Sequence, residues 1–216
     1  MSKNFMGIRK RIINFINASI EIDYLEKRIR DKHDIELRKN CLFGQNTRFS
    51  MKTSIDNLSH KRENIRIGNQ VICKGQLLIF RYAGQIEIGD NVFIGEGARI
   101  WSGSELGIKI GNDVLISHNV FIGDTNSHEI DYLQRASSFI EMTTQGHPKI
   151  NPGVETKPVV IEDNVWLSFN VIVMKGVTIG KGSIIGAGSI ITKDIPPFSL
   201  VVGNPARILK SLINKE

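Results

Sequence analysis

The sequence has little of what marks a secreted or membrane-spanning protein. Its 216 residues include two cysteines, Cys41 and Cys73, which are too few for a disulfide framework. No apolar run approaches the length of a membrane span. The apolar patch over 12–20 is interrupted by Asn14 and Asn17, and no small-residue cleavage site follows it, so a signal peptide is not expected. The two cysteines are expected to be reduced thiols. This expectation and the absence of a signal peptide predict a cytoplasmic protein.

The usual nucleic-acid-binding motifs are also missing, although the chain is basic. The net charge is +6 at pH 7 and the isoelectric point is about 9.4. A basic balance can indicate nucleic acid, anionic lipid or a phosphorylated small molecule as a partner. Neither the aromatic motif of RNA-binding modules nor a zinc-finger spacing occurs, so no nucleic-acid partner is predicted.

Aromatic residues make up only 7% of the chain, and aliphatic residues dominate its pattern. An aliphatic residue recurs at every sixth position in the C-terminal part, at Ile161, Leu167, Val173, Ile179, Ile185 and Ile191. A period of six fits neither a helix nor a plain strand. It is typical of a solenoid in which short strands alternate with corners and stacked coils bury a continuous core. A narrow interior of this kind takes aliphatic side chains.

The same frame occurs upstream, with longer turns. Three sets of hexads begin at Ile67, Ile88 and Ile110, spaced 21 and 22 residues apart, whereas a three-sided turn of three hexads needs eighteen. Each of these turns therefore carries three or four extra residues at one corner. The next set begins 51 residues later, at Ile161, so a loop of roughly thirty residues must leave the solenoid after Ile122. Loops of that length are usually functional.

These patterns predict an all-β solenoid flanked by helices. Residues 1–40 form a helical leader, residues 41–203 form the hexapeptide-repeat solenoid with an excursion loop over 124–160, and residues 204–216 form a short C-terminal helix. Asn204 and Pro205 read as the cap and first position of that last helix. Residues 6–31 read as one or two basic amphipathic helices, which would either cap the solenoid or contact an anionic membrane surface.

Two stretches of the sequence resemble a known family. Residues 161–210, with GAGSIITKDIPP and GNPAR, are similar to the C-terminal half of the hexapeptide-repeat acyltransferases. Residues 116–131, ISHNVFIGDTNSHEID, resemble the active-site stretch of the polysaccharide O-acetyltransferase branch. The resemblance implies a left-handed parallel β-helix and a homotrimer with active sites between subunits. It also implies acetyl transfer from acetyl-CoA to a sugar, plausibly of a surface polysaccharide or its precursor.

The resemblance places the catalytic base at His128. Acetyl transfer to a hydroxyl needs a base that removes the proton, and histidine suits that role near neutral pH. Asp124, Glu129 or a backbone carbonyl could orient the ring of His128. Asn126 could contact hydroxyls of the acceptor, and His147 could make a second contact.

A geometric argument independent of the family concerns a second histidine. His118 and Glu96 occupy the same position of hexads one coil apart, so both should face outward as neighbours about 4.8 Å apart. They could form a catalytic dyad or only a surface pair. We expect both residues, His118 and Glu96, to contribute to binding of the acceptor rather than to act as the base. Beside them, Asn119 could contact the acceptor or stabilise a turn.

Counting hexad positions in the same way places Ser102, Asp124 and Lys175 in a second column of outward-facing residues. The excursion starts from this column, at Asp124.

The resemblance also implies a groove for acetyl-CoA. Arg207 and Lys210, three apart on the predicted C-terminal helix, would hold the phosphates of the coenzyme. Phe169 stands where relatives often carry a small or polar residue, which would reshape the pantetheine channel. The full set of expected coenzyme-binding residues is Trp166, Ser168, Ala187, Thr192, Lys193, Arg207 and Lys210.

Three alternatives to sugar O-acetylation are an N-acetyltransferase, a zinc enzyme and a binding protein without chemistry. An N-acetyltransferase for an amino sugar would use the same site. A zinc carbonic anhydrase on the same solenoid needs two closely spaced histidines, whereas His118, His128 and His147 are ten and nineteen residues apart, so no metal is predicted. A binding solenoid without chemistry would have no need of the long loop and its histidines.

Overall fold

The computed structural model describes residues 2–213, with side chains from residue 21 onward. The chain divides into two units, residues 1–37 and residues 38–216. The first unit belongs to α1 (Ser2–Asn40), a single continuous helix. The helical leader predicted for residues 1–40 is therefore confirmed as one helix rather than two.

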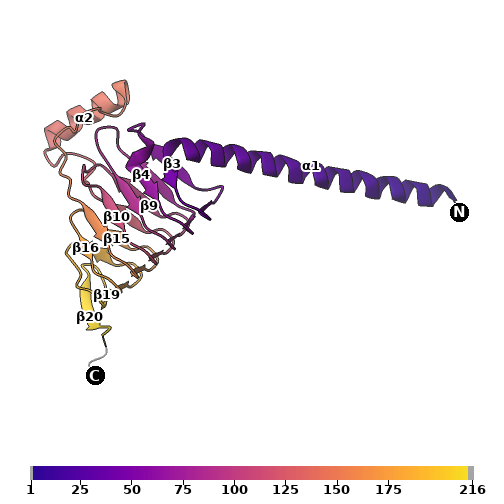
Figure 1. The fold of residues 1–216 in the computed structure, drawn as a ribbon. Helices are drawn as coiled ribbons and strands as arrows, with labels where there is room; N and C mark the ends of the chain where they lie inside the picture. The colour runs from indigo at the N-terminus through magenta and orange to yellow at the C-terminus, as the bar shows by residue number, and fades with distance from the viewer. Residues whose placement is uncertain (1, 214–216) are drawn as a thin grey trace. The chain divides into compact units, whose positions relative to one another are not determined.

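The second unit is a left-handed parallel β-helix built from three sheets, with the coils stacked along one axis (Figure 1). The first sheet contains β1 (Leu42–Phe43), β4 (Ile65–Ile67), β7 (Ile86–Ile88), β10 (Ile108–Ile110), β13 (Val159–Ile161) and β16 (Thr178–Ile179).

The second sheet contains β2 (Arg48–Phe49), β5 (Ile72–Cys73), β8 (Phe93–Ile94), β11 (Leu115–Ile116), β14 (Trp166–Leu167), β17 (Ile184–Ile185), β19 (Ser199–Val202) and β20 (Arg207–Ser211). The third contains β3 (Ser54–Asn57), β6 (Gln76–Ile79), β9 (Arg99–Ser102), β12 (Phe121–Gly123), β15 (Ile172–Val173) and β18 (Ile190–Ile191).

The hexad frame predicted the core correctly. All six residues of the C-terminal series are buried, from Ile161 at 1% exposed to Ile191 at 0%. Strands of successive coils pair in parallel with these residues in register, for example Ile161 with Ile179 and Leu167 with Ile185. Cys73 lies in the same frame, and burial raises the pKa of its thiol to about 11.

The extra residues of the longer turns all lie at one corner, between the third sheet and the next strand of the first. Residues 58–64, with a 3-10 helix at Arg62–Asn64, follow β3, and residues 80–85 and 103–107 follow β6 and β9. The excursion follows β12 at the same corner and contains α2 (Tyr132–Gln145), which lies outside the stack of coils (Figure 1). The insertions of neighbouring coils therefore gather along one edge of the β-helix.

The predicted C-terminal helix is wrong for the described residues. After Gly203 the chain turns and forms β20, which pairs antiparallel with β19. A strand at the end of a sheet presents unpaired backbone N–H and C=O groups, and a returning segment satisfies them. Residues 206–213 form this return instead of a helix, while 214–216 lie outside the described residues.

Candidate active site

The excursion starts from a buried carboxylate, Asp124. The Ser102 hydroxyl donates to its Oδ2 at 2.6 Å, and the backbone N–H groups of Gly103 and Ser104 donate to the same carboxylate at 2.7 and 3.2 Å. Burial raises the pKa of Asp124, and these hydrogen bonds oppose that rise. Ser102 and Asp124 are neighbours as predicted, but they are buried rather than outward-facing because the inserted corners cover them.

Two contacts hold the outgoing and returning limbs of the excursion together. Thr125 and Thr156 form an antiparallel bridge, and the Asn126 N–H donates to the Glu155 carbonyl at 3.1 Å. The Glu155 carboxylate in turn lies 3.1 Å from the Lys175 Nζ, so Lys175 supports the returning limb rather than a column with Asp124. The backbone of Asn126 is part of this contact between the two limbs. Asn126 was predicted to contact the acceptor.

The helix α2 is tied back to the segment that carries His128. Asp131 caps its first turn by accepting from the N–H groups of Leu133 and Gln134. The Ser138 hydroxyl donates to the Glu129 carboxylate and thereby lowers the pKa of Glu129. These bonds fix the position of α2 relative to the residue next to His128.

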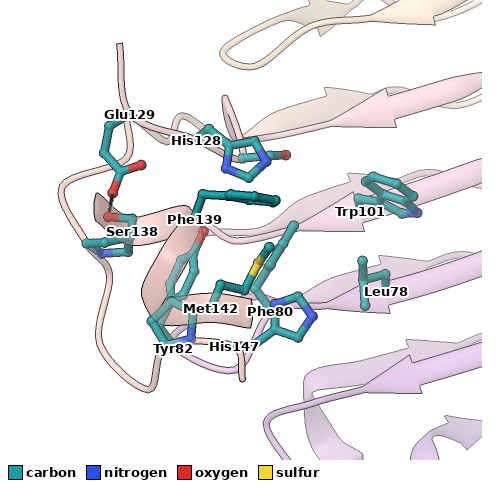
Figure 2. Close-up of a pocket in the computed structure, with 13 residues that line it drawn as sticks. Leu78, Phe80, Tyr82, Trp101, His128, Glu129, Ser138, Phe139, Met142 and His147 are labelled. Atoms are coloured by element: carbon teal, nitrogen blue, oxygen red, sulfur yellow. Dashed lines mark hydrogen bonds between the residues drawn. The ribbon is translucent and has the colours of Figure 1, made fainter. Parts of the chain in front are cut away.

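A cavity of about 270 Å³ lies between α2 and the outer face of the third sheet. Leu78 and Trp101 lie on that sheet, Phe80 and Tyr82 come from the corner after β6, and α2 contributes Ser138, Phe139 and Met142. His128 and His147 line the cavity from the two limbs of the excursion, and Figure 2 shows them well separated, with Phe139 and Met142 between them. Two of the three histidines that the sequence pointed to thus line one cavity, at separate places on its wall.

Tyr82 lines this cavity, but its hydroxyl oxygen is closed off from it. The hydroxyl oxygen of Tyr82 is buried and makes no hydrogen bond of ordinary geometry within residues 2–213, although the Thr125 side chain lies beside it. Burial raises the pKa of this phenol. The ring stacks on Phe80, with centroids 5.7 Å apart, so the hydroxyl is held by a rigid pair of rings.

His118 lies elsewhere, at the corner between the second and third sheets. It is next to Glu96 as predicted, but the backbone N–H of Glu96 donates to the Nδ1 of His118 at 3.1 Å. The Glu96 carboxylate binds the Lys52 ammonium, which lowers the pKa of Glu96. The two residues are therefore neighbours, and of the two alternatives, a side-chain dyad or a surface pair, the dyad is not formed.

The rings around His118 fix its plane. Phe169 stacks on it with centroids 5.9 Å apart and an angle of 8° between the planes, and Phe93 meets it edge-on at 6.4 Å. The residue that departs from the family pattern, Phe169, thus packs on His118. Asn119 beside them has a φ of 58°, so it serves the turn at this corner.

The expected coenzyme residues lie on several parts of the C-terminal coils. Trp166 is on the outer face of the second sheet, 40% exposed, with its indole N–H donating to Ser117 at 3.2 Å. Ser168 and the exposed Ala187 lie at the corner between the second and third sheets, in successive coils. Thr192 and Lys193, also exposed, follow β18 at a different corner, so one chain does not gather all seven residues at one place.

Arg207 and Lys210 share a face of β20 although that segment is not a helix. On a regular strand residues three apart point to opposite faces. Here the register shifts by one residue, so that Arg207 pairs with Val202 and Lys210 with Leu200. Directly paired residues share a face, and Leu200 and Val202 share one because they are two apart. The bulge therefore places both cations on one exposed face. A shared face was expected, but from a helix rather than from a bulged strand.

The residues that the sequence analysis missed are the apolar walls of the cavity. Phe80 and Tyr82 occupy the extra corner positions that the 21-residue spacing had revealed, so a signal for them existed. Trp101, Phe139 and Met142 carried no such signal, because nothing in the spacing indicates where the excursion folds back.

Comparison with known protein families supports this architecture. Residues 158–193 match the model for bacterial transferase hexapeptide, six repeats, and residues 85–124 match that for the hexapeptide repeat of succinyl-transferase. The repeats of this chain are therefore similar to those of the hexapeptide-repeat transferases. Within residues 2–213 the chain has no cluster of metal-ligating side chains, and neither of its helices is long and apolar enough to span a membrane.

The proteins that this chain resembles include named enzymes. It is 36% identical over 151 residues to the polysialic acid O-acetyltransferase of Escherichia coli O1:K1, over 70% of this chain and 41% of that one. The chain spans about half the length of the curated relatives it matches.

Solved structures agree with the fold. AntD, an N-acyltransferase from Bacillus cereus solved with dTDP-4-amino-4,6-dideoxyglucose and coenzyme A, superposes with a TM-score of 0.64 at 24% identity over 84% of this chain and 90% of that one. A hexapeptide-repeat-containing acetyltransferase from Vibrio cholerae superposes with a TM-score of 0.55 at 26% identity over 90% of each chain.

Proposed function

We propose that this chain is an acetyl-CoA-dependent O-acetyltransferase that acts on a sugar hydroxyl of a surface polysaccharide or its precursor. The observation that carries the proposal is the cavity beside His128, on an excursion from a β-helix of the hexapeptide-repeat transferases. Two relatives support the substrates. The Escherichia coli relative is named for O-acetylation of polysialic acid, and the Vibrio cholerae acetyltransferase was also solved with acetyl coenzyme A.

In this mechanism His128 is the general base. Its imidazole removes the proton of the acceptor hydroxyl as the oxygen attacks the carbonyl carbon of the thioester. The carbon–sulfur bond then breaks, the acetyl group remains on the sugar oxygen as an ester, and the proton passes from His128 to the sulfur to give coenzyme A.

His118 is poorly placed for this role. A neutral imidazole has one nitrogen that can accept a proton and one that already carries it. The Nδ1 of His118 accepts the backbone N–H of Glu96, so its accepting nitrogen is occupied and the proton lies on Nε2. His128 makes no hydrogen bond with another side chain among the described residues and lines the cavity, so its accepting nitrogen can face a substrate.

Asp124 acts indirectly in this proposal. Its carboxylate is engaged by Ser102, Gly103 and Ser104, and that of Glu129 by Ser138. Asp124 therefore holds the start of the excursion, and through it the position of His128, rather than touching the imidazole.

An N-acetyltransferase acting on an amino sugar is the second candidate, because AntD was solved with such a sugar nucleotide. Incubation with acetyl-CoA and paired neutral and amino sugars, followed by detection of free coenzyme A thiol, tests both. Transfer to hydroxyl acceptors supports the O-acetyltransferase, and transfer confined to amines replaces it with the second candidate. No thiol release and no acetyl-CoA binding would refute both.

The first prediction in this scheme concerns the coenzyme. Replacing Arg207 and Lys210 together with alanine should raise the KM for acetyl-CoA at least tenfold, because each contact between a cation and a phosphate contributes about 1.5–3 kcal/mol. The KM for the acceptor should change little. Steady-state kinetics with each substrate varied in turn provides the measurement.

The matched control is the double replacement of Arg66 and Lys109 with alanine. Both residues lie on the outer face of the first sheet, so the same charge is lost elsewhere on the β-helix. An unchanged KM in the Arg207 and Lys210 variant, or an equal rise in the control, would place the phosphates elsewhere.

A homotrimer is the predicted assembly. The outer face of the second sheet carries a continuous apolar column, in register from coil to coil: Ile72, Phe93, Leu115, Trp166, Ile184 and Leu200. Association about a threefold axis would cover such a flat face. Light scattering at micromolar concentration should give three times the chain mass of 24.2 kDa, and a monomer would contradict the prediction.

The proposal also covers where the enzyme acts in the cell. A cytoplasmic enzyme would meet its acetyl-CoA and a sugar precursor in one compartment. Contact of residues 6–31 with an anionic membrane surface remains a prediction, for which vesicle sedimentation is the measurement.

A further inference from the structure

We propose that Ser138 and Arg135 of α2 are positioning residues for the general base: they hold the segment that carries His128 and so set the direction of its imidazole. This inference rests on the proposed function and adds two residues to it. Neither residue takes part in the proton transfer. Both act through the backbone next to His128.

The imidazole of His128 has little support of its own. The residue is exposed at the cavity, and its ring makes no hydrogen bond with another side chain among the described residues. A base must lie within hydrogen-bond reach of the proton that it removes, and a displacement of about 1 Å can cost roughly a hundredfold in rate. The direction of the ring therefore depends on how firmly the backbone around His128 is held.

The backbone before His128 is fixed by the start of the excursion. Thr125 forms a bridge with Thr156 on the returning limb, and its hydroxyl oxygen accepts the Ser127 N–H at 3.0 Å. Ser127 has a φ of 64°, in the left-handed region that residues other than glycine rarely adopt. The chain therefore turns just before His128, and the contacts that hold this turn do not involve α2.

Three hydrogen bonds from α2 fix the backbone after His128. The Arg135 guanidinium donates to the carbonyl oxygens of Glu129 and Ile130 at 2.8 and 2.9 Å. The Ser138 hydroxyl donates to the Glu129 carboxylate, and Figure 2 draws this bond as a dashed line. A charged group takes part in each of the three bonds, and such bonds are stronger than those between neutral groups.

Glu129 is the residue through which α2 holds this segment. Its side chain is buried, with the residue 5% exposed, whereas His128 and Ile130 on either side are exposed. A buried carboxylate needs hydrogen-bond partners, and Ser138 supplies one from α2. Figure 2 shows the side chains of Glu129 and His128 pointing away from each other. Holding the carboxylate against α2 therefore keeps the imidazole on the opposite side of the backbone, at the cavity.

A double-mutant cycle tests whether Ser138 acts through His128. Ser138→Ala should lower kcat about tenfold and leave the KM for acetyl-CoA unchanged. In the His128→Ala background the same change should have no further effect, because no imidazole remains to be positioned. An equal reduction of kcat in both backgrounds would show a purely structural role and would overturn the inference.

Two neighbouring changes are the controls for Ser138. Ser137→Ala makes the same substitution on an adjacent exposed residue of α2 and should alter neither kcat nor KM. Ser138→Thr keeps the hydroxyl and should retain most of the activity. Kinetics measured below the melting temperature of every variant compare folded proteins only. Equal kcat values for Ser138→Ala and Ser137→Ala would refute the role of Ser138.

Arg135→Met removes the two contacts with the carbonyl oxygens. Its kcat should fall about tenfold or more, and the effect should again disappear in the His128→Ala background. Lys149→Met is the matched control, because it removes a cation from an exposed position on the returning limb, and its kcat should not change. An unchanged kcat in Arg135→Met, or an equal fall in the control, would remove Arg135 from the assignment.

Glu129→Gln separates position from charge. The amide oxygen can still accept from the Ser138 hydroxyl, so kcat should stay closer to that of the unchanged protein than in Glu129→Ala. Equal losses in these two variants would show that the carboxylate acts by its charge and would overturn the inference. The unchanged protein tests the proposed function separately: no acetyl-CoA binding and no thiol release refute that function, whereas normal turnover in both Ser138→Ala and Arg135→Met refutes the positioning role alone.

Discussion

Replacing His128 with alanine should lower kcat by about 10²–10⁴-fold, the usual cost of losing a general base. No other group at the cavity takes its place among the described residues, because His147 lies apart from it across Phe139 and Met142 (Figure 2) and the Glu129 carboxylate is engaged by Ser138. Calorimetry should show unchanged binding of acetyl-CoA, and light scattering an unchanged assembly, because His128 is an exposed loop residue outside the core.

His118→Ala is the matched comparison. Its accepting nitrogen is occupied by the Glu96 N–H and its ring is fixed by Phe169, so its loss should reduce the rate far less than the loss of His128. Measuring kcat for both variants decides between them. Abolished turnover in His118→Ala with a mild effect in His128→Ala would show that the base lies at the corner between the second and third sheets.

Replacing Val171 with aspartate should produce the largest loss of stability. Val171 is fully buried in the hexad frame and is surrounded by aliphatic side chains of the same and neighbouring coils. A carboxylate there would be an unpaired charge in a narrow apolar interior, which costs more than about 4 kcal/mol and commonly prevents folding. Thermal unfolding followed by circular dichroism, with the soluble yield, provides the measurement.

Asn170→Asp is the control for this change. It introduces the same residue one position earlier, at an exposed corner whose φ of 58° aspartate also tolerates. Its melting temperature should stay close to that of the unchanged protein. A soluble Val171→Asp variant that melts like this control would contradict the hexad frame.

Much of the fold could be predicted because the period-six pattern reports burial directly. Ile161, Leu167 and Val173 recur in the sequence at the same interval at which the backbone turns a corner, so each faces the same core. The end of the chain could not be predicted in the same way. Asn204 and Pro205 resemble a helix start locally, but the open edge of β19 offers backbone hydrogen bonds that a helix would leave unmade.

The site was predicted in part. The excursion and the candidate His128 followed from spacing and family resemblance, and the stacked position of Glu96 and His118 followed from counting hexads. The spacing did not predict that Lys52 binds the Glu96 carboxylate, because Lys52 lies two coils away along the β-helix. It also did not predict that Asp124 is buried, since the inserted corner at 103–107 supplies its hydrogen bonds.

The sequence by itself determined the coils and the core, because a repeat records the environment of each residue at a fixed interval. Only the tertiary structure decided the cavity. Its walls come from Leu78 and Trp101 on stacked strands, Tyr82 at a corner, Met142 on α2 and His147 on the returning limb. These segments meet because the excursion folds back over the third sheet and is tied there by its own hydrogen bonds. That folding depends on contacts between distant residues, which no periodicity encodes.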